Sequence, residues 1–379
     1  MMKCKSCRPL IEILAEIPDF RKAKGKRHPL SAILAMACAA TLCGYKSYSA
    51  IAEWGRNYGG KLVQALGFTH KKTPCASTLH TVFRNIDKKE VESKLGSWAE
   101  SVMSDAEIPE DDLAGVSLDG KTLGGSKKQG APGTHLLSAV SHKLGVTLTQ
   151  QAGEHSTDEM RIIHEALQNL IIEGRVFTMD ALNAQRNTAE TITQEGGDYV
   201  MIAKGNQLSL LDDVKTVFHG PCSHLLHKSS ARTLDMGHGR IEERCLTASD
   251  ELSDYSDWPG LEQVFQLTRK TIIIKTEEVR EETVYGVTSL TPQQADPERL
   301  LELVRCHWHI ENKSHWVRDV TFSEDKSQVR CGNIPQVMAA IRNMAIGLMR
   351  WLGYTNIASA CRYFAAQPWD ALEAIGIQK

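Results

Sequence analysis

The sequence has no hydrophobic run long enough to span a membrane. Its longest apolar stretch, Leu30–Cys43, contains 14 residues and is rich in alanine, whereas a transmembrane helix needs about 20 apolar residues. This stretch therefore predicts a buried helix. The chain also has no internal repeat and no low-complexity tract, and its apolar (42%) and charged (24%) fractions are ordinary for a globular protein. A length of 379 residues predicts two or three domains.

The cysteines lack the spacing of a disulfide framework or of a complete zinc site. There are ten, scattered along the chain. Cys4-x-x-Cys7 matches half of a zinc site, but no second Cys-x-x-Cys and no paired histidine pattern accompanies it. Without a signal peptide, such cysteines predict a reduced, cytoplasmic protein.

The overall net charge is only −2, but the charge is unevenly distributed between the N-terminal third and the rest of the chain. Residues 1–100 carry 17 Lys/Arg against 8 Asp/Glu, and the remainder carries 27 against 38. A basic N-terminal third predicts contact with a polyanion such as DNA. The alternative is an uneven surface without function. The acidic remainder fits a site built from carboxylates.

Residues 1–105 predict an all-α domain of helix-turn-helix type that binds DNA. After Thr73-Pro74, apolar residues recur at helical spacing: Leu79, Val82, Phe83 and Ile86. Hydroxyls and bases occupy most of the opposite face: Ser77, Thr78, Thr81, Arg84 and Lys88. This pattern is typical of a recognition helix, and we predict that Arg84 contacts DNA. A solvated helix without a ligand has the same pattern.

Residues 106–379 predict an α/β fold with the element order of an RNase H-like catalytic core. The expected strands are Val116–Leu118, His135–Val140, Val146–Gln150, Arg175–Asp180 and Tyr199–Ala203, with helices at Thr157–Ile172 and Gln185–Gln194. A β-rich insertion follows at about 205–295, with strands around Ile241–Leu246, Val264–Leu267, Thr271–Ile274 and Val284–Leu290. Helices at about Pro297–Val317 and Ile334–Leu352 complete the core.

Two acids end apolar strands, Asp119 and Asp180. In an RNase H-like core these strands pair in parallel, so the two carboxylates would lie side by side and repel each other. A buried carboxylate needs a cationic partner, either a salt bridge or a metal. Two Mg²⁺ (or Mn²⁺) ions would relieve the repulsion and support phosphoryl transfer at DNA.

Glu311 is the first candidate for a third acid. Trp308, Glu311 and His315 fall on one face of the expected helix. We predict Asp119, Asp180 and Glu311 as the catalytic and metal-binding residues. The alternative makes Glu311 a surface residue beside a core tryptophan. Three other acids compete for the third position and lie at or beyond the helix end: Asp319, Glu324 and Asp325.

Cations near these acids are predicted DNA contacts. Lys204 leaves the fifth strand at the same edge of the sheet, and Arg305 and Arg318 flank Glu311. A solvated side chain is the alternative for each. The remaining predicted contacts are Lys121, directly after the first acid, and His238 and Arg240 in the insertion.

Several motifs together resemble one family of insertion-sequence DDE transposases, which includes the H-repeat-associated proteins linked to Rhs elements. The motifs are Ile17–Arg21, Ser117–Lys121, Asp180–Gln185, Lys204–Gln207, His238–Glu242, His307–Asn312, Asp319–Phe322 and Glu324-Asp325. The resemblance covers nearly the whole chain. It implies a DDE triad of Asp119, Asp180 and Glu311, a bacterial, nucleoid-associated enzyme, and an N-terminal domain for the terminal inverted repeats. Because two DNA ends are brought together, it also implies a homodimer on DNA.

The chain departs from the family pattern in two places. Gly124 stands where the family often has an arginine. Of the wider superfamily's tyrosine–arginine–glutamate–lysine signature, the tyrosine position holds Val304, the arginine position His307 and the lysine position Arg318. These departures concern DNA contacts and leave the triad intact.

Two other functions compete with transposition. One is an RNase H-fold endonuclease that cuts DNA without joining it. The other is a decayed or domesticated copy that only binds DNA. Joining would identify a transposase, cutting alone a nuclease, and binding alone a protein without catalytic activity.

Overall fold

The computed structural model describes residues 8–105, 113–127, 133–153 and 159–378. The chain forms two compact units, each assembled from segments distant in sequence. The first unit comprises Met1–Pro109, Gly120–Leu170 and Ile310–Lys379, and the second comprises Glu110–Asp119 and Ile171–His309.

The second unit is built on a mixed sheet. Among the described residues its strands follow the order β1-β4-β5-β9-β8-β7-β6. Their bounds are β1 (Ala114–Thr122, the last three residues lying in the first unit), β4 (Arg175–Met179), β5 (Asp198–Ala203), β6 (Ser229–Gly237), β7 (Arg240–Ser249), β8 (Gln263–Ile273) and β9 (Val279–Thr288). The pairs β1–β4 and β4–β5 are parallel, and the other pairs are antiparallel. The predicted parallel pairing of the two acid-bearing strands is confirmed.

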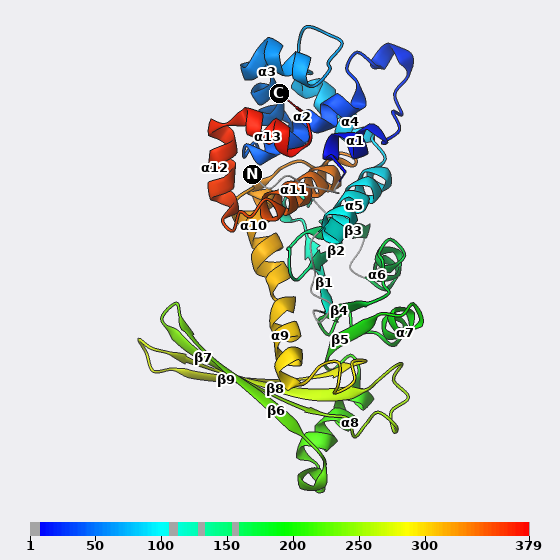
Figure 1. Ribbon diagram of the computed structural model, residues 1–379, viewed down its shortest axis with the longest axis vertical. Helices are drawn as coiled ribbons and strands as arrows, with labels where there is room; N and C mark the ends of the chain where they lie inside the picture. The colour runs from blue at the N-terminus through cyan, green and yellow to red at the C-terminus, as the bar shows by residue number, and fades with distance from the viewer. Residues whose placement is uncertain (1–7, 106–112, 128–132, 154–158, 379) are drawn as a thin grey trace. The chain divides into compact units, whose positions relative to one another are not determined.

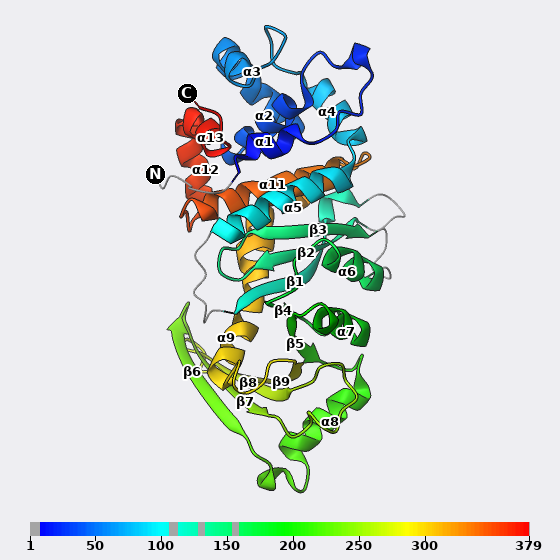
Figure 2. The same cartoon turned by 45° about the vertical axis from the view of Figure 1, so that its right-hand side comes forward.

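Three helices of the second unit are α7 (Arg186–Gln194), α8 (Leu208–His219) and α9 (Pro297–His307). Helices α8 and α9 cover opposite faces of the sheet formed by β6–β9 (Figures 1 and 2). Leu300, Leu301 and Val304 of α9 pack in one core cluster with Leu246 of β7 and Phe265 of β8. This packing fixes α9 against the strands by its apolar stripe.

The β-rich insertion consists of longer strands than the sequence predicts. The expected strands Val264–Leu267 and Thr271–Ile274 are one continuous strand, β8. Residues of opposite charge lie across from each other in the register of β8 and β9, Arg269 opposite Glu282 and Lys270 opposite Glu281. Neighbours of opposite charge on adjacent strands favour pairing even where the middle of a strand consists of charged residues. Strand β6 and helix α8 were not predicted.

The tip of the β6–β7 hairpin is a two-residue turn at His238-Gly239. Gly237 pairs with Arg240 directly across the turn, and φ is +51° at His238 and +73° at Gly239. Positive φ at both central residues is the type I′ geometry that matches strand twist. The backbone N–H of Ile274 also donates to the Gly239 carbonyl at 2.9 Å, so the tip is anchored to the end of β8.

The first unit contains the N-terminal helices α1 (Leu10–Ala15), α2 (Leu30–Leu42), α3 (Tyr48–Ala65), α4 (Ala76–Asn85) and α5 (Lys88–Asp105). It also contains the antiparallel strands β2 (His135–Ser141) and β3 (Thr147–Gly153), helix α6 (Glu159–Leu167), and the C-terminal helices α10 (Trp316–Val320), α11 (Ile334–Trp351), α12 (Ile357–Ala366) and α13 (Pro368–Ala374). Helices α12 and α13 were not predicted. No helix in the described ranges is long and apolar enough to cross a membrane.

The predicted N-terminal helices are largely confirmed. The alanine-rich helix α2 is buried along almost its whole length. Helix α4 begins at Ala76, later than the expected start at Thr73-Pro74, but its predicted inner residues Leu79, Val82 and Phe83 are buried. Helices α2 and α5 pack against α11 (Figure 2). The N-terminal and C-terminal helices therefore share one core.

A buried polar chain connects three elements of this core. Gln150 Nε2 of β3 donates to Glu92 Oε1 of α5 at 2.9 Å, and Asn343 Nδ2 of α11 donates to Gln150 Oε1 at 2.9 Å. Burial raises the pKa of Glu92 to about 7, although the Gln150 hydrogen bond acts in the opposite direction. The folded protein therefore holds a proton on Glu92 at pH values where the unfolded chain has released it.

This raised pKa predicts a pH-dependent stability. The stabilising contribution is complete below the unfolded pKa of about 4.5 and is lost as pH rises through about 7, by about 3 kcal/mol. Glu92→Gln should remove this part of the pH dependence, measured as the free energy of unfolding in urea between pH 4.5 and 8. Glu90→Gln on the same helix is the control and should retain the wild-type dependence. An equal dependence in wild type and Glu92→Gln would contradict the assignment.

Candidate active site

Two of the three predicted catalytic acids lie on neighbouring strands of the second unit. The parallel register pairs Leu118 of β1 with Met179 of β4, so Asp119 and Asp180 each follow a paired residue. Both acids are partly buried. Adjacent strands lie about 4.8 Å apart, and residues in register point to the same face. The arrangement therefore brings two carboxylates side by side.

A repeated hydroxyl–apolar–acid pattern fixes the face to which these acids point. Ser117 precedes Asp119 by two residues, and Thr178 precedes Asp180 by two. Because side chains alternate along a strand, each hydroxyl shares a face with its acid. Thr178 Oγ1 donates to Ser117 Oγ at 3.4 Å. The shared pattern Ser-Leu-Asp and Thr-Met-Asp is the sequence signal for these buried hydroxyls, which were not among the predicted site residues.

His307 at the end of α9 packs on this face. Its Nδ1 lies 3.2 Å from Thr178 Oγ1, and its carbonyl accepts a hydrogen bond from Ser117 Oγ at 3.3 Å. Burial lowers the pKa of the His307 imidazole, while the negative charge of Asp180 acts in the opposite direction. The ring is therefore neutral near pH 7, and it connects α9 to both acid-bearing strands.

The loop after β4 orients Asp180. Asn183 donates to Asp180 Oδ1 from its backbone N–H at 3.3 Å and from Nδ2 at 3.2 Å. Asn206 Nδ2 donates to the Ala181 carbonyl at 2.6 Å. The Asp180–Gln185 and Lys204–Gln207 motifs are thus joined, and Lys204 is exposed beside them.

Glu311 lies in the first unit, within a π-helical segment, η5 (Ile310–His315). The expected helix Pro297–Val317 is helical over most of its length but is not one α-helix, because α9 ends at His307, Ile310–His315 is π-helical and α10 begins at Trp316. The predicted common face of Trp308, Glu311 and His315 assumed α-helical pitch and does not form: His315 is buried and Trp308 is 56% exposed. Single π-helical turns are frequent at functional sites.

Glu311 differs from its three competitors in having no partner. It is exposed and forms no side-chain hydrogen bond or ion pair with any described residue. The competing acids are engaged within the first unit: Asp319 accepts from Lys121 Nζ at 2.5 Å, Asp325 accepts from the Gly124 N–H at 3.0 Å, and Glu324 pairs with two arginines. Glu311 is therefore the acid of this segment that is available to a ligand.

The two arginines on Glu324 form a buried ion cluster. Arg318 Nε and Arg342 Nη1 each donate to a different Glu324 oxygen at 2.8 Å, and all three residues are buried. Burial raises the pKa of Glu324, but Arg318 and Arg342 outweigh it, so the pKa lies below its usual range. Arg342 Nη2 also donates to the Lys46 carbonyl at 3.0 Å. The cluster connects α10 and α11 with the segment between α2 and α3.

The predicted DNA contacts fall into two groups. Arg84, Lys204 and His238 are exposed. The others have partners in the protein: Lys121 with Asp319, Arg318 with Glu324, Arg240 with Glu242 at 2.7 Å and Arg305 with Asp235 at 3.0 Å. Arg318 is 0% exposed, so its guanidinium is not accessible to DNA.

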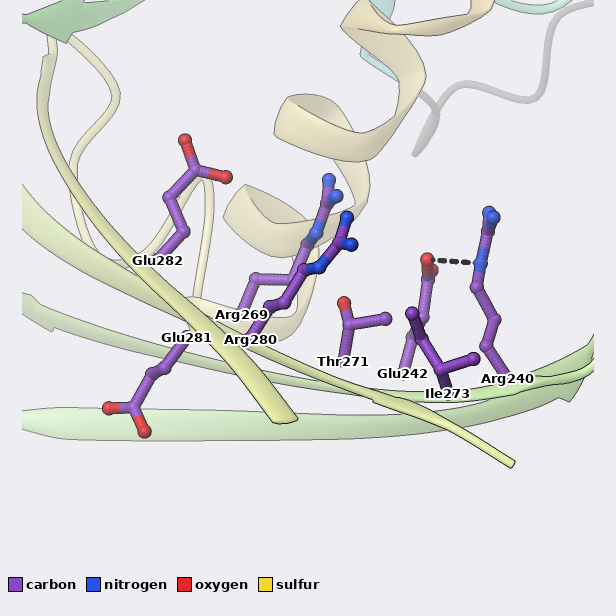
Figure 3. Close-up of a pocket in the computed structure, with 8 residues that line it drawn as sticks. All are labelled: Arg240, Glu242, Arg269, Thr271, Ile273, Arg280, Glu281 and Glu282. Atoms are coloured by element: carbon purple, nitrogen blue, oxygen red, sulfur yellow. Dashed lines mark ion pairs between the residues drawn. The ribbon is translucent and has the colours of Figure 1, made fainter. Parts of the chain in front are cut away.

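The structure adds two arginines to the face that carries Arg240. Arg269 of β8 and Arg280 of β9 extend in the same direction beside one another, whereas Glu281 points to the opposite side (Figure 3). Arg280 pairs with exposed Glu278, and Arg269 has no ion-pair partner among the described residues. Both arginines lie outside the strands that the sequence analysis expected, so no sequence signal drew attention to them.

The donor set is suited to a hard divalent cation, because carboxylate oxygens are the ligands that Mg²⁺ and Mn²⁺ prefer. In the described ranges, no three His, Cys, Asp or Glu residues lie close enough together to hold a metal ion. The fit of a divalent cation therefore rests on the adjacent pair Asp119 and Asp180 of the second unit.

Comparison with protein families identifies the class. The family described as "Transposase DDE domain" matches residues 110–348, and the one described as "DDE_Tnp_1-associated" matches residues 11–99. The chain belongs to the DDE transposase family.

Its relatives place it with the H repeat-associated transposases. It is 30% identical over 352 residues to "H repeat-associated putative transposase YhhI" and 31% identical over 352 residues to "Putative protein YbfL", both from Escherichia coli K12, with 90% of each chain covered. It is also 29% identical to "Putative transposase YncI" of E. coli O157:H7, covering 91% of this chain and 88% of the relative. The solved piggyBac transposase synaptic complex with hairpin DNA aligns at a TM-score of 0.42 and 10% identity, covering 97% of this chain and 77% of that one.

The buried ion cluster predicts a large loss of stability for Glu324→Gln. The substitution leaves Arg318 and Arg342 buried without a counter-charge, which should lower the free energy of unfolding by roughly 3–5 kcal/mol. Thermal unfolding with circular dichroism measures it. The matched control, Asp325→Asn, alters an exposed neighbour and should cost less than about 1 kcal/mol. Equal melting temperatures for the two variants would contradict the assigned role of Glu324.

Proposed function

We propose that this chain binds the terminal inverted repeats of an insertion sequence and catalyses cleavage and joining of DNA strands with two Mg²⁺ or Mn²⁺ ions. The observation that carries the proposal is the placement of Asp119 and Asp180 at the same level of parallel strands β1 and β4. This pairing, together with the order of strands and helices, supports an RNase H-like catalytic core in the proposal.

Asp119, Asp180 and Glu311 would hold the metal ions. When bound, the ions would activate a water or a DNA 3′-hydroxyl and stabilise the departing oxygen. The chain's own contribution is orientation: Asn183 holds one oxygen of Asp180, and neutral His307 fixes the strand ends without adding charge. Repulsion between adjacent carboxylates favours a cation between them.

DNA affinity is assigned to cations outside this site. Residues 1–100 supply the excess of positive charge, and Arg84 lies exposed on α4. Because α2 and α5 share a core with α11, removal of residues 1–100 would also damage the first unit. Substitution of exposed cations is therefore the appropriate test of binding.

Joining of two ends by one complex implies a homodimer on DNA.

The carboxylate triad is tested by Asp119→Asn, Asp180→Asn and Glu311→Gln. Each change keeps the side-chain shape and removes the charge, so Mg²⁺-dependent cleavage and joining should fall at least 100-fold while DNA binding in EDTA is retained. The melting temperature of each variant without metal should stay the same or rise, because the repulsion between the clustered carboxylates is reduced. Cleavage and joining of a labelled inverted-repeat DNA measure the first effect, and melting temperatures the second.

Asp319→Asn and Asp325→Asn are the matched controls for Glu311→Gln, since both acids have partners within the protein. If Glu311→Gln cleaves DNA almost normally while either control loses cleavage, the third catalytic acid is not Glu311. Wild-type cutting without joining would favour the nuclease, and binding without cutting would favour the DNA-binding protein.

The arm formed by β6–β9 is proposed to contact DNA phosphates through Arg269 and Arg280, in addition to His238 and Arg240. Arg269→Ala/Arg280→Ala should weaken binding and reduce the slope of log K against log salt by about 2, since two phosphate contacts are lost. Fluorescence anisotropy with duplex DNA from 50 to 300 mM NaCl measures the slope. The control Glu281→Gln, on the opposite face, should leave it unchanged. An unchanged slope in the double variant would make the arm a structural element only.

A further inference from the structure

The first unit has a groove that the proposed function does not yet use. It is formed by the end of α2, the segment from η5 to α10, the end of α11 and the start of α12. The lining residues that matter here are Lys46, Lys313, Trp316, Val320, Arg350 and Arg362. All belong to one compact unit.

The groove is positively charged. Lys46, Lys313, Arg350 and Arg362 line it, and no aspartate or glutamate does. Arg350 donates to the carbonyls of Gly145 and Lys313, which are neutral. Burial lowers the pKa of Arg350 to about 10, so it remains charged at pH 7. Cationic side chains gathered in a concave site attract an anion such as a phosphate chain.

The groove also presents an aromatic ring. Trp316 is 56% exposed and Val320, one turn later on α10, is 54% exposed. Residues four apart share a helix face, so the indole and the valine form one apolar strip among the cations. Exposed aromatic rings beside basic side chains are the means by which proteins bind unpaired nucleotides, with bases on the rings and phosphates on the cations.

We propose that this groove binds a single-stranded segment of DNA, with a base stacked on Trp316 and phosphates near Lys46 and Arg362. Arg362 is exposed and has no partner among the described residues. A duplex fits the apolar strip less well, because its bases are already stacked on each other. The inference rests on the proposed function, since strand cleavage and transfer generate unpaired DNA ends.

Binding of a fluorescein-labelled 12-nucleotide single strand, measured by anisotropy in EDTA, tests the proposal. Trp316→Ala should weaken single-strand binding by roughly 5- to 100-fold, which corresponds to loss of one stacked base, and should leave duplex binding within about two-fold. Trp316→Phe should restore most of the affinity, because it keeps an aromatic face. Arg362→Gln should reduce the salt slope by about 0.7.

Trp308→Ala is the matched control, because Trp308 is also 56% exposed but belongs to the second unit. It should bind the single strand as wild type does. Melting temperatures establish that each variant is folded. Equal binding by Trp316→Ala and wild type, an equal loss for duplex and single strand, or no measurable single-strand binding by wild type would each overturn the proposal.

The test is independent of catalysis. It contains no divalent metal, so failure of the carboxylate triad would alter cleavage and leave the anisotropy unchanged. If the triad variants lose cleavage but Trp316→Ala binds normally, the groove proposal alone is wrong.

Discussion

The parallel pairing of β1 with β4 is the constraint on which the site depends. Its register aligns Ser117 with Thr178 and Leu118 with Met179, and it therefore brings Asp119 next to Asp180. Carboxylates on neighbouring strands repel each other when both are charged. The apolar residues and the buried hydroxyls hold the strands in this register despite the repulsion. A cation bound between the two carboxylates would relieve this repulsion.

Most of the strands that carry this site could be predicted from sequence, because each is a short apolar run ended by an acid or a turn. The parallel pairing followed from the order of strands and helices. Strand β6 was missed because it is an exposed edge strand with little apolar alternation. Strand β8 was divided in two because its centre, Arg269-Lys270, is charged and lacks the apolar residues from which strands were predicted.

The surroundings of the third acid could not be predicted by the same reasoning. The prediction assumed a uniform α-helical pitch from Pro297 to Val317. The π-helical turn changes which side chains share a face. The partner of Lys121 lies 198 residues away, so the position of this lysine beside Asp119 in the sequence did not reveal that it is engaged within the protein. Arg318 was chosen for its position beside Glu311, although its charge is used within the protein core.

Location of manganese in the crystallised protein tests the central claim most directly. Anomalous diffraction at the manganese edge, with crystals soaked in MnCl₂, reports each metal position without requiring DNA or activity. The account predicts manganese bound by the Asp119 and Asp180 carboxylates, with Glu311 completing the site. Manganese bound instead by Asp319 or Asp325, or no peak at the ends of β1 and β4 at millimolar manganese, would contradict it.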